Sequence, residues 1–262
     1  MGDSNEKEMT FWEHLDELRK VFFRMALAVL SLACIAFIFK DFLFSIVLAP
    51  QRPDFILYRF FNNLAQKYAM PYLETGNFQI ELISTQLTSQ FMTHMSVALY
   101  AGLLLASPYI IYLLFQFVSP ALHKAERKIC LKILFPAFFL FFAGITLNYF
   151  IIFPLSFRFL ATYQVSETVT NLISLSSYIS SFIMLSLLLG AAFEIPVIDS
   201  FLAKLHLVNA NLLKRYRKHS FVGILILAAI ITPTSDVFTL LLVTLPLYLL
   251  YELSIQVVRR NS

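Results

Sequence analysis

The sequence predicts an all-α protein that crosses a membrane six times and forms one integral membrane domain over residues 1–262. Hydrophobic residues make up 59% of the chain, and charged residues make up only 14%. With 28 Phe as well, the chain carries more apolar surface than a water-soluble core of this length can bury. The apolar residues also fall into long runs separated by polar segments, which is the pattern of membrane-spanning helices.

The first expected element is an amphipathic helix over residues 10–20 (TFWEHLDELRK). Thr10 and Glu13 fit a capping box, and apolar residues recur at helical spacing, so this helix is expected at the cytoplasmic surface before the first span. Its polar face carries the acids Glu13, Asp16 and Glu17. Such a cluster attracts a cationic partner, although it is also compatible with a solvated face of local ion pairs.

Six apolar runs are candidate spans, because a helix needs about 20 residues to cross about 30 Å of hydrocarbon. They are Val21 to Phe39, Phe91 to Val118, Ile129 to Phe153, Tyr178 to Leu202, Phe221 to Ile231 and Val237 to Val258. The fifth run has 11 residues, a rise of only about 16 Å. We expect the last two runs to form two short helices rather than one re-entrant hairpin, because Thr232 to Asp236 (TPTSD) is a strong turn signal.

Four prolines fall inside the apolar runs. Each one removes a backbone hydrogen bond and favours a kink, and kinked helices can enclose a concavity. Proline is also simply commoner in membrane helices, so a single one does not establish a bend. The four are Pro108, Pro136, Pro196 and Pro246.

The distribution of Lys and Arg predicts the orientation, because cytoplasmic segments accumulate positive charge. With the N-terminus inside, thirteen basic residues lie in inside segments and five in outside segments. Both termini are therefore expected in the cytoplasm, and residues 40–87 form a long first external loop. The net charge of +4 then follows from the topology and requires no nucleic-acid partner.

Glu194 is the most unusual residue of the apolar runs, since it lies inside MLSLLLGAAFEIPVI (Met184 to Ile198). An acid at the centre of a bilayer costs roughly 2.5 to 3.5 kcal/mol, so it is expected to face protein or water and to be functional. A purely structural acid bonded to a neighbouring span is the alternative. A second notable acid, Glu126, lies among basic residues in the first cytoplasmic loop, where an ion pair within the loop is the simplest interpretation.

Several classes of site have no support in the sequence. Cys34 and Cys130 are far apart and not in metal-ligand spacing, so neither a disulfide nor a metal site is predicted. No phosphate-binding loop, HExxH or GxSxG motif occurs, which argues against an ATPase and against an intramembrane protease. We expect no cofactor and no catalytic residue.

Six motifs in the same order resemble the TatC family, the polytopic receptor subunit of the twin-arginine protein translocase. They are HLDELRK at 14–20, FVSPALHKAERK at 117–128, FIIFPLSFRFL at 150–160, GAAFEIPV at 190–197, TPTSD at 232–236 and PLYLLYELSI at 246–255. The resemblance implies six helices in a glove-like arrangement with a concave face and the last two helices short. It also implies the cytoplasmic (inner) membrane of a prokaryote.

The resemblance further implies roles for individual residues. Glu17 and Glu126 match the carboxylates that bind the paired arginines of a signal peptide, and the residues that shape that site match Leu15, Arg19, Phe117 and Pro120. Glu194 and Asp236 match acids associated with partner subunits or transport, and Pro50 matches a proline of the first external loop. Leu240 departs from the glutamine of some members, and no role is implied for the added stretch around 55–77.

The implied function is to bind the twin-arginine signal peptide of folded proteins and to support their export with small single-span subunits of the TatA and TatB type. The proton motive force would supply the energy. The main alternative is a proton- or ion-coupled transporter of small solutes, in which Glu194, Asp199, Asp236 and Glu252 would be the coupling groups. That alternative requires the acids to converge on one site, whereas Asp199 and Asp236 are expected toward opposite ends of their spans.

Overall fold

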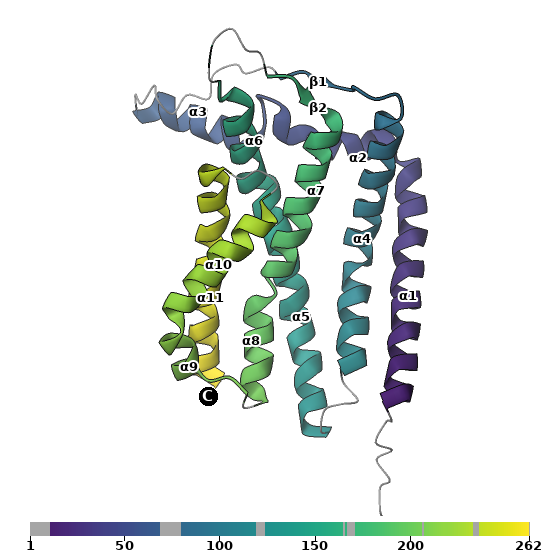
Figure 1. Ribbon diagram of the computed structural model, residues 1–262, viewed down its shortest axis with the longest axis vertical. Coiled ribbons are helices and arrows are strands. Elements are labelled where there is room, and N and C mark those ends of the chain that lie inside the picture. Colours follow the sequence, from purple (N-terminus) through teal and green to yellow (C-terminus); the bar gives the residue numbers. More distant parts are fainter. Residues whose placement is uncertain are drawn as a thin grey trace, which may run out of the picture.

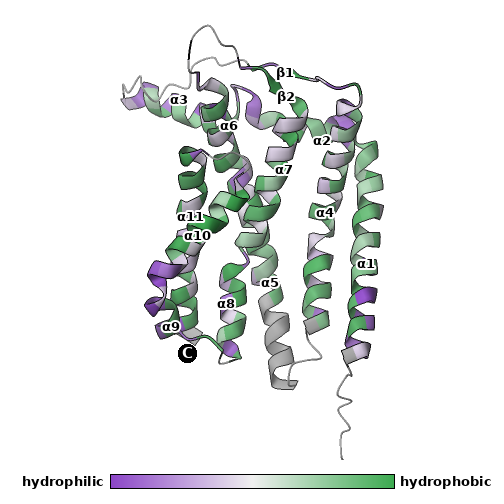
Figure 2. Ribbon diagram, viewed as in Figure 1, coloured by the Kyte–Doolittle hydropathy of each residue, from purple (hydrophilic) through white to green (hydrophobic). Residues whose placement is uncertain are grey.

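The computed structural model is almost entirely helical (Figure 1). It describes residues 11–68, 80–118, 124–164, 166, 171–205, 207–232 and 236–261. Five helical stretches are long and apolar enough to cross a membrane: Trp12–Ile38, Ser89–Phe117, Leu134–Thr162, Leu175–Lys204 and Val237–Arg259. Figure 2 shows these stretches as mainly hydrophobic, with hydrophilic residues toward the two ends of the molecule. This confirms a multi-pass helical membrane protein.

The first span is one continuous helix, α1 (Phe11–Ile38). The amphipathic segment that the sequence predicts over 10–20 is helical from Phe11, but it runs straight into the apolar run instead of forming a separate helix. The physical reason is that no Gly or Pro lies between Phe11 and Ile38 to end the helix. Helix α4 (Ser89–Val118) packs along α1 and is the second span.

The third span is longer than the sequence predicts. Helix α5 (Lys124–Leu147) continues through a π-helical turn (Asn148–Ile152) into α6 (Phe153–Thr162), nine residues beyond the predicted end at Phe153. Pro154 lies in the first turn of α6, where the missing N–H leaves fewer bonds unmade than in a helix interior. Asn148 in the π turn is fully buried and donates to the hydroxyl of Ser186 at 2.8 Å.

The fourth span is broken. Helix α7 (Leu175–Ala192) ends before Glu194, and α8 (Ile195–Lys204) begins after it with Pro196 in its first turn. The other three prolines inside the apolar runs lie within α4, α5 and α11 without interrupting the helix. Of these four prolines, Pro196 is therefore the one at which the helix is interrupted.

The last two apolar runs form the helices α10 (Arg217–Ile231) and α11 (Val237–Asn261), and α9 (Ala210–Arg215) precedes them. With 15 residues, α10 is short, as the sequence predicts. The prediction that both are short is wrong for α11, which has 25 residues, because its apolar run from Val237 to Val258 is itself long enough to cross the membrane. The start of α1 and the end of α11 lie at the same end of the molecule (Figure 1).

The core is centred on α7, which packs mainly against α5 and α4 and also contacts α10, and whose aromatic rings meet those of α6. Phe153, Tyr178, Phe182, Leu185 and Leu189 are among its most buried members. Two glycines allow neighbouring helices to approach closely. A Cβ on Gly102 of α4 would lie 2.6 Å from the backbone N of Ala33 in α1, and one on Gly144 of α5 would lie 2.8 Å from the carbonyl O of Leu189 in α7.

The described part of residues 40–87, which the sequence predicts to be the first external loop, forms a cap on the other end of the bundle (Figure 1). Its elements are α2 (Lys40–Val47), a 3-10 turn (Ala49–Gln51), α3 (Ile56–Tyr68) and the short strand β1 (Leu82–Ile83). Strand β1 pairs in parallel with β2 (Ile173–Ser174), which directly precedes α7. The cap therefore joins the segment between α1 and α4 to the segment between α6 and α7.

Buried tyrosines fix this cap to the bundle. The hydroxyl of Tyr58 in α3 donates to the carbonyl oxygens of Pro50 at 3.1 Å and Pro154 at 2.9 Å, and its side chain is fully buried. Tyr178 of α7 donates to the carbonyl of Val47 at 2.9 Å, and Tyr149 donates to that of Ile46 at 3.0 Å. Burial raises the pKa of the Tyr58 phenol well above its usual range, so the phenol stays a proton donor at physiological pH.

We predict that Gly102→Ala and Gly144→Ala each destabilise the protein, because the added methyl meets backbone atoms that cannot move aside. Overpacking of this kind costs about 1–3 kcal/mol. The measurement is the Tm of the purified protein in detergent. Gly223→Ala in α10 is the control, since nothing lies within 4 Å of a Cβ there. A Tm as low for Gly223→Ala as for the other two would contradict the packing argument.

We also predict that Tyr58→Phe lowers the Tm, because the substitution leaves two buried carbonyl oxygens without their shared donor. An unsatisfied buried polar group costs about 1–3 kcal/mol. Tyr68→Phe is the matched control, since Tyr68 lies in the same helix but is 56% exposed. Equal stability of Tyr58→Phe and the wild type would show that the hydrogen bonds do not hold the cap.

Candidate functional site

The start of α1 and the end of α4 meet at one end of the molecule. The ring of His14 stacks on Phe117, with centroids 4.4 Å apart and planes inclined by 23°. This contact brings the acidic segment of α1, with Leu15 exposed and Glu17 half-buried, beside the C-terminal turn of α4. Three of the predicted site residues therefore lie close to one another: Leu15, Glu17 and Phe117.

The other predicted members of this site are placed less fully. Glu126 is the third residue of α5, which begins at the same end of the molecule as α1 (Figure 1). Pro120 lies outside the described residues. Arg19 is exposed, and its guanidinium carbon lies 5.8 Å from the centre of the Phe23 ring. It therefore extends along α1 rather than toward the stacked pair.

Glu194 lies in the break between α7 and α8 and borders an apolar crevice. The crevice has a volume of about 260 Å³ and is lined on the α4 side by Ile111, Leu114 and Phe115. Val197, Ile198 and Phe201 of α8 line the other side. One carboxylate oxygen of Glu194 is buried and accepts no hydrogen bond from the described residues. The crevice is therefore an apolar surface with Glu194 at its wall.

The same face of α4 borders a second crevice nearer the cap. Helical spacing puts Ser89, Thr93 and Ser96 in line with Ile111 and Leu114. This crevice has a volume of about 470 Å³, and its other wall is the serine-rich start of α7 (Ser176, Ser177 and Ser180). One face of α4 therefore lines two crevices of opposite character, a polar one near the cap and an apolar one beside Glu194.

Pro50 and Asp236 have structural partners. Pro50 is buried in the 3-10 turn, and its carbonyl accepts the Tyr58 hydroxyl. Asp236 precedes α11, and its side chain accepts the backbone N–H of Thr239 at 2.6 Å, as a helix N-cap does.

The role of Tyr58 was not predicted from the sequence, and no role was predicted for the stretch around 55–77 in which it lies. The signal was present, because Phe55, Tyr58 and Ala65 recur at helical spacing and are all buried.

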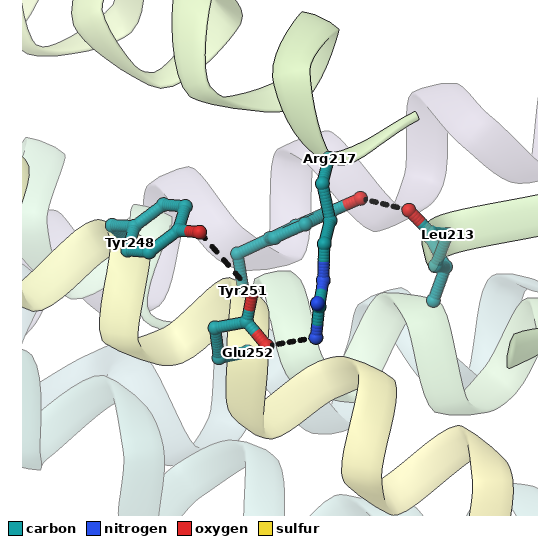
Figure 3. Close-up of polar contacts among 5 residues, drawn as sticks. All are labelled: Leu213, Arg217, Tyr248, Tyr251 and Glu252. Atoms are coloured by element: carbon teal, nitrogen blue, oxygen red, sulfur yellow. Dashed lines mark hydrogen bonds and ion pairs between the residues drawn. The ribbon is translucent and has the colours of Figure 1, made fainter. Parts of the chain in front are cut away.

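Glu252 of α11 belongs to a polar cluster that joins α11 to α9 and α10 (Figure 3). It accepts from the Arg217 guanidinium at 2.6 Å and from the Tyr248 hydroxyl at 3.2 Å. Tyr251, one residue earlier, donates to the carbonyl of Leu213 at 2.7 Å. These contacts indicate that Glu252 holds α11 against α9 and α10.

The acids that a solute transporter would need do not form one site. Glu194 faces the crevice beside α4, Asp236 caps α11, and Glu252 is paired with Arg217. Asp199 lies in α8 with one buried carboxylate oxygen. Within the described ranges, no three His, Cys, Asp or Glu side chains are grouped as metal ligands would be.

Comparison with known proteins identifies the family. The model of the family described as "Sec-independent protein translocase protein (TatC)" matches residues 13–246. The TatC protein of Blattabacterium sp. subsp. Periplaneta americana is 36% identical over 97% of this chain and 96% of its own length. That of Carboxydothermus hydrogenoformans is 32% identical over 95% of this chain and 93% of its own.

Solved structures agree with the sequence matches. A crystal structure of the twin-arginine translocase receptor TatC superposes with a TM-score of 0.72 at 31% identity and covers 94% of this chain and 97% of its own. A second one, in the detergent DDM, gives a TM-score of 0.74 and covers 94% of this chain and all of its own. TatC proteins are components of a protein translocase and are not enzymes. The chain therefore belongs to the TatC family of Sec-independent protein translocase proteins and is a multi-pass bacterial membrane protein.

Proposed function

We propose that this protein is the signal-peptide receptor of a twin-arginine translocase. It binds the paired arginines of a folded cargo protein's signal peptide through Glu17 and Glu126. The observation that carries the proposal is the contact between the start of α1 and the end of α4, where His14 stacks on Phe117. It presents Glu17 at the end of the molecule where α5, with Glu126 in its first turn, also begins (Figure 1).

Carboxylates suit this ligand because a guanidinium is planar and always charged, and can donate two parallel hydrogen bonds to one carboxylate. Two carboxylates on different helices can each bind one arginine. This arrangement explains why a signal peptide would need two arginines. Leu15, Phe117 and Pro120 are proposed to border the peptide, and Arg19 is proposed to adjust the local charge. This site would lie on the cytoplasmic side, with both termini in the cytoplasm and six crossings, α10 being the short fifth.

Glu194 is proposed to act after recognition. A signal peptide has an apolar stretch after its arginines, and the crevice between α4 and α8 is an apolar surface that such a stretch or a partner helix can cover. A polar group of a single-span subunit of the TatA or TatB type would then meet the free carboxylate oxygen of Glu194. Asp236 and Pro50 are proposed to contribute indirectly, by fixing the start of α11 and the external cap. The proton motive force would drive transport.

We predict that Glu17→Ala and Glu126→Ala each weaken binding of a twin-arginine peptide by at least about 30-fold. Truncating one partner of a charge pair costs about 2–5 kcal/mol, because the other charge is left unpaired. Binding is measured with a fluorescent peptide and the purified protein in detergent, beside a peptide with two lysines. Asp16→Ala is the control, since it removes the same charge from the adjacent position of α1. Wild-type binding in Glu17→Ala, Glu126→Ala and the double variant would exclude the receptor role of these acids.

We predict that Glu194→Gln and Glu194→Ala keep peptide affinity within about threefold but reduce transport by at least tenfold, because the lost carboxylate faces the crevice and not the start of α1. Transport is measured by export of a tagged cargo, and assembly by co-purification of the single-span subunits. Glu81→Gln, on the exposed external loop, is the control. A loss of peptide binding as large as in Glu17→Ala would place Glu194 in the recognition site instead.

A further inference from the structure

Helix α1 carries three basic residues on the side that faces away from α4. The rings of His14 and Phe117 and the buried Val21 mark the side that packs on α4. Asp16, Arg19, Lys20, Phe23 and Arg24 line a pocket of about 520 Å³ on the opposite side. We call these residues the α1 basic pocket. Three cations against one carboxylate give it a net positive charge.

Arg24 is unusually deep for a charged residue. The apolar stretch Trp12–Ile38 has 27 residues, about 40 Å of helix against about 30 Å of hydrocarbon. Arg24 lies 14 residues, or about 21 Å, before Ile38, where α1 ends at the external cap. It is therefore about 9 Å inside the opposite edge of the hydrocarbon. Its charge must reach the headgroup region to stay solvated.

The geometry of an α-helix directs the side chain of Arg24 toward Lys20. Side chains of an α-helix point toward its N-terminus, so the guanidinium of Arg24 extends back along α1 by about one turn. Lys20 lies one turn earlier on the same side. Among the described residues, no carboxylate forms an ion pair with Lys20 or Arg24. Two cations thus converge at the headgroup level without a protein partner.

The surface beyond these cations is apolar. Phe23, Leu27 and Leu30 follow on the same side of α1 and are 66%, 69% and 55% exposed. A ligand that fits both parts has a negative headgroup and long apolar chains. We infer that the α1 basic pocket binds an anionic phospholipid, with its phosphate between Lys20 and Arg24 and its acyl chains along Phe23, Leu27 and Leu30. This inference does not depend on the receptor function.

The test compares lipid binding by the full-length protein in detergent, using native mass spectrometry with added phosphatidylglycerol or phosphatidylcholine of the same chain length. Each basic residue at a membrane surface contributes a factor of about five in affinity, so Lys20→Ala with Arg24→Ala is expected to weaken phosphatidylglycerol binding roughly 30-fold. Arg24→Lys, which keeps the charge, is expected to retain most of it.

The matched control is Lys214→Ala with Arg215→Ala, which removes one lysine and one arginine from the exposed face of α9. It is expected to bind phosphatidylglycerol like the wild type. An equal loss in this control, or equal affinity of the wild type for both lipids, would show only general charge attraction and would overturn the inference. Displacement of the lipid by millimolar inorganic phosphate would make the pocket a site for free phosphate instead.

Discussion

Hydrocarbon supplies no hydrogen-bond partners, so every backbone N–H and C=O in the membrane must be satisfied within the protein. The structure meets this constraint with long helices, and it does so even where the fourth span is interrupted, since the N–H of Glu194 donates to the carbonyl of Ala191 and that of Ile198 donates to the carbonyl of Glu194. Pro196 cannot donate to the preceding turn, and the chain is interrupted between α7 and α8. This interruption holds Glu194 at the wall of the crevice beside α4, where one of its oxygens accepts no hydrogen bond from the described residues.

The two ends of the bundle are organised differently. At the end that carries the cap, tyrosine hydroxyls and the β1–β2 pairing tie the loops to α6 and α7. At the other end, α1 meets the bundle mainly through α4, and the His14–Phe117 stack is the contact nearest the proposed recognition site.

Much of this could be predicted from the sequence, because hydrophobic runs and charge bias follow directly from the bilayer. Five apolar runs became long helices, and the shortness of α10 followed from counting residues. The sequence could not show that the helix is interrupted at Pro196 but not at Pro108, Pro136 or Pro246. Contacts with neighbouring helices decide whether a helix bends at a proline. Tyr58 was missed because its partners, the carbonyls of Pro50 and Pro154, become neighbours only in the fold. Leu15, Glu17 and Phe117 were grouped by family resemblance, not by spacing, and their shared role stays a prediction.

The parallel pairing of β1 with β2 has a consequence for biogenesis. Leu82 pairs with Ile173, 91 positions later, and Tyr178 reaches Val47 across 131 positions. Contacts of such long range form only after the chain between them is in place. Until the third span is made, residues 40–68 lack Tyr149, Phe150 and Pro154, against which Phe55 and Tyr58 pack. A chain stalled before the third span would therefore display Phe55 and Tyr58 to quality-control proteases, and the strand pairing would still wait for β2 and α7.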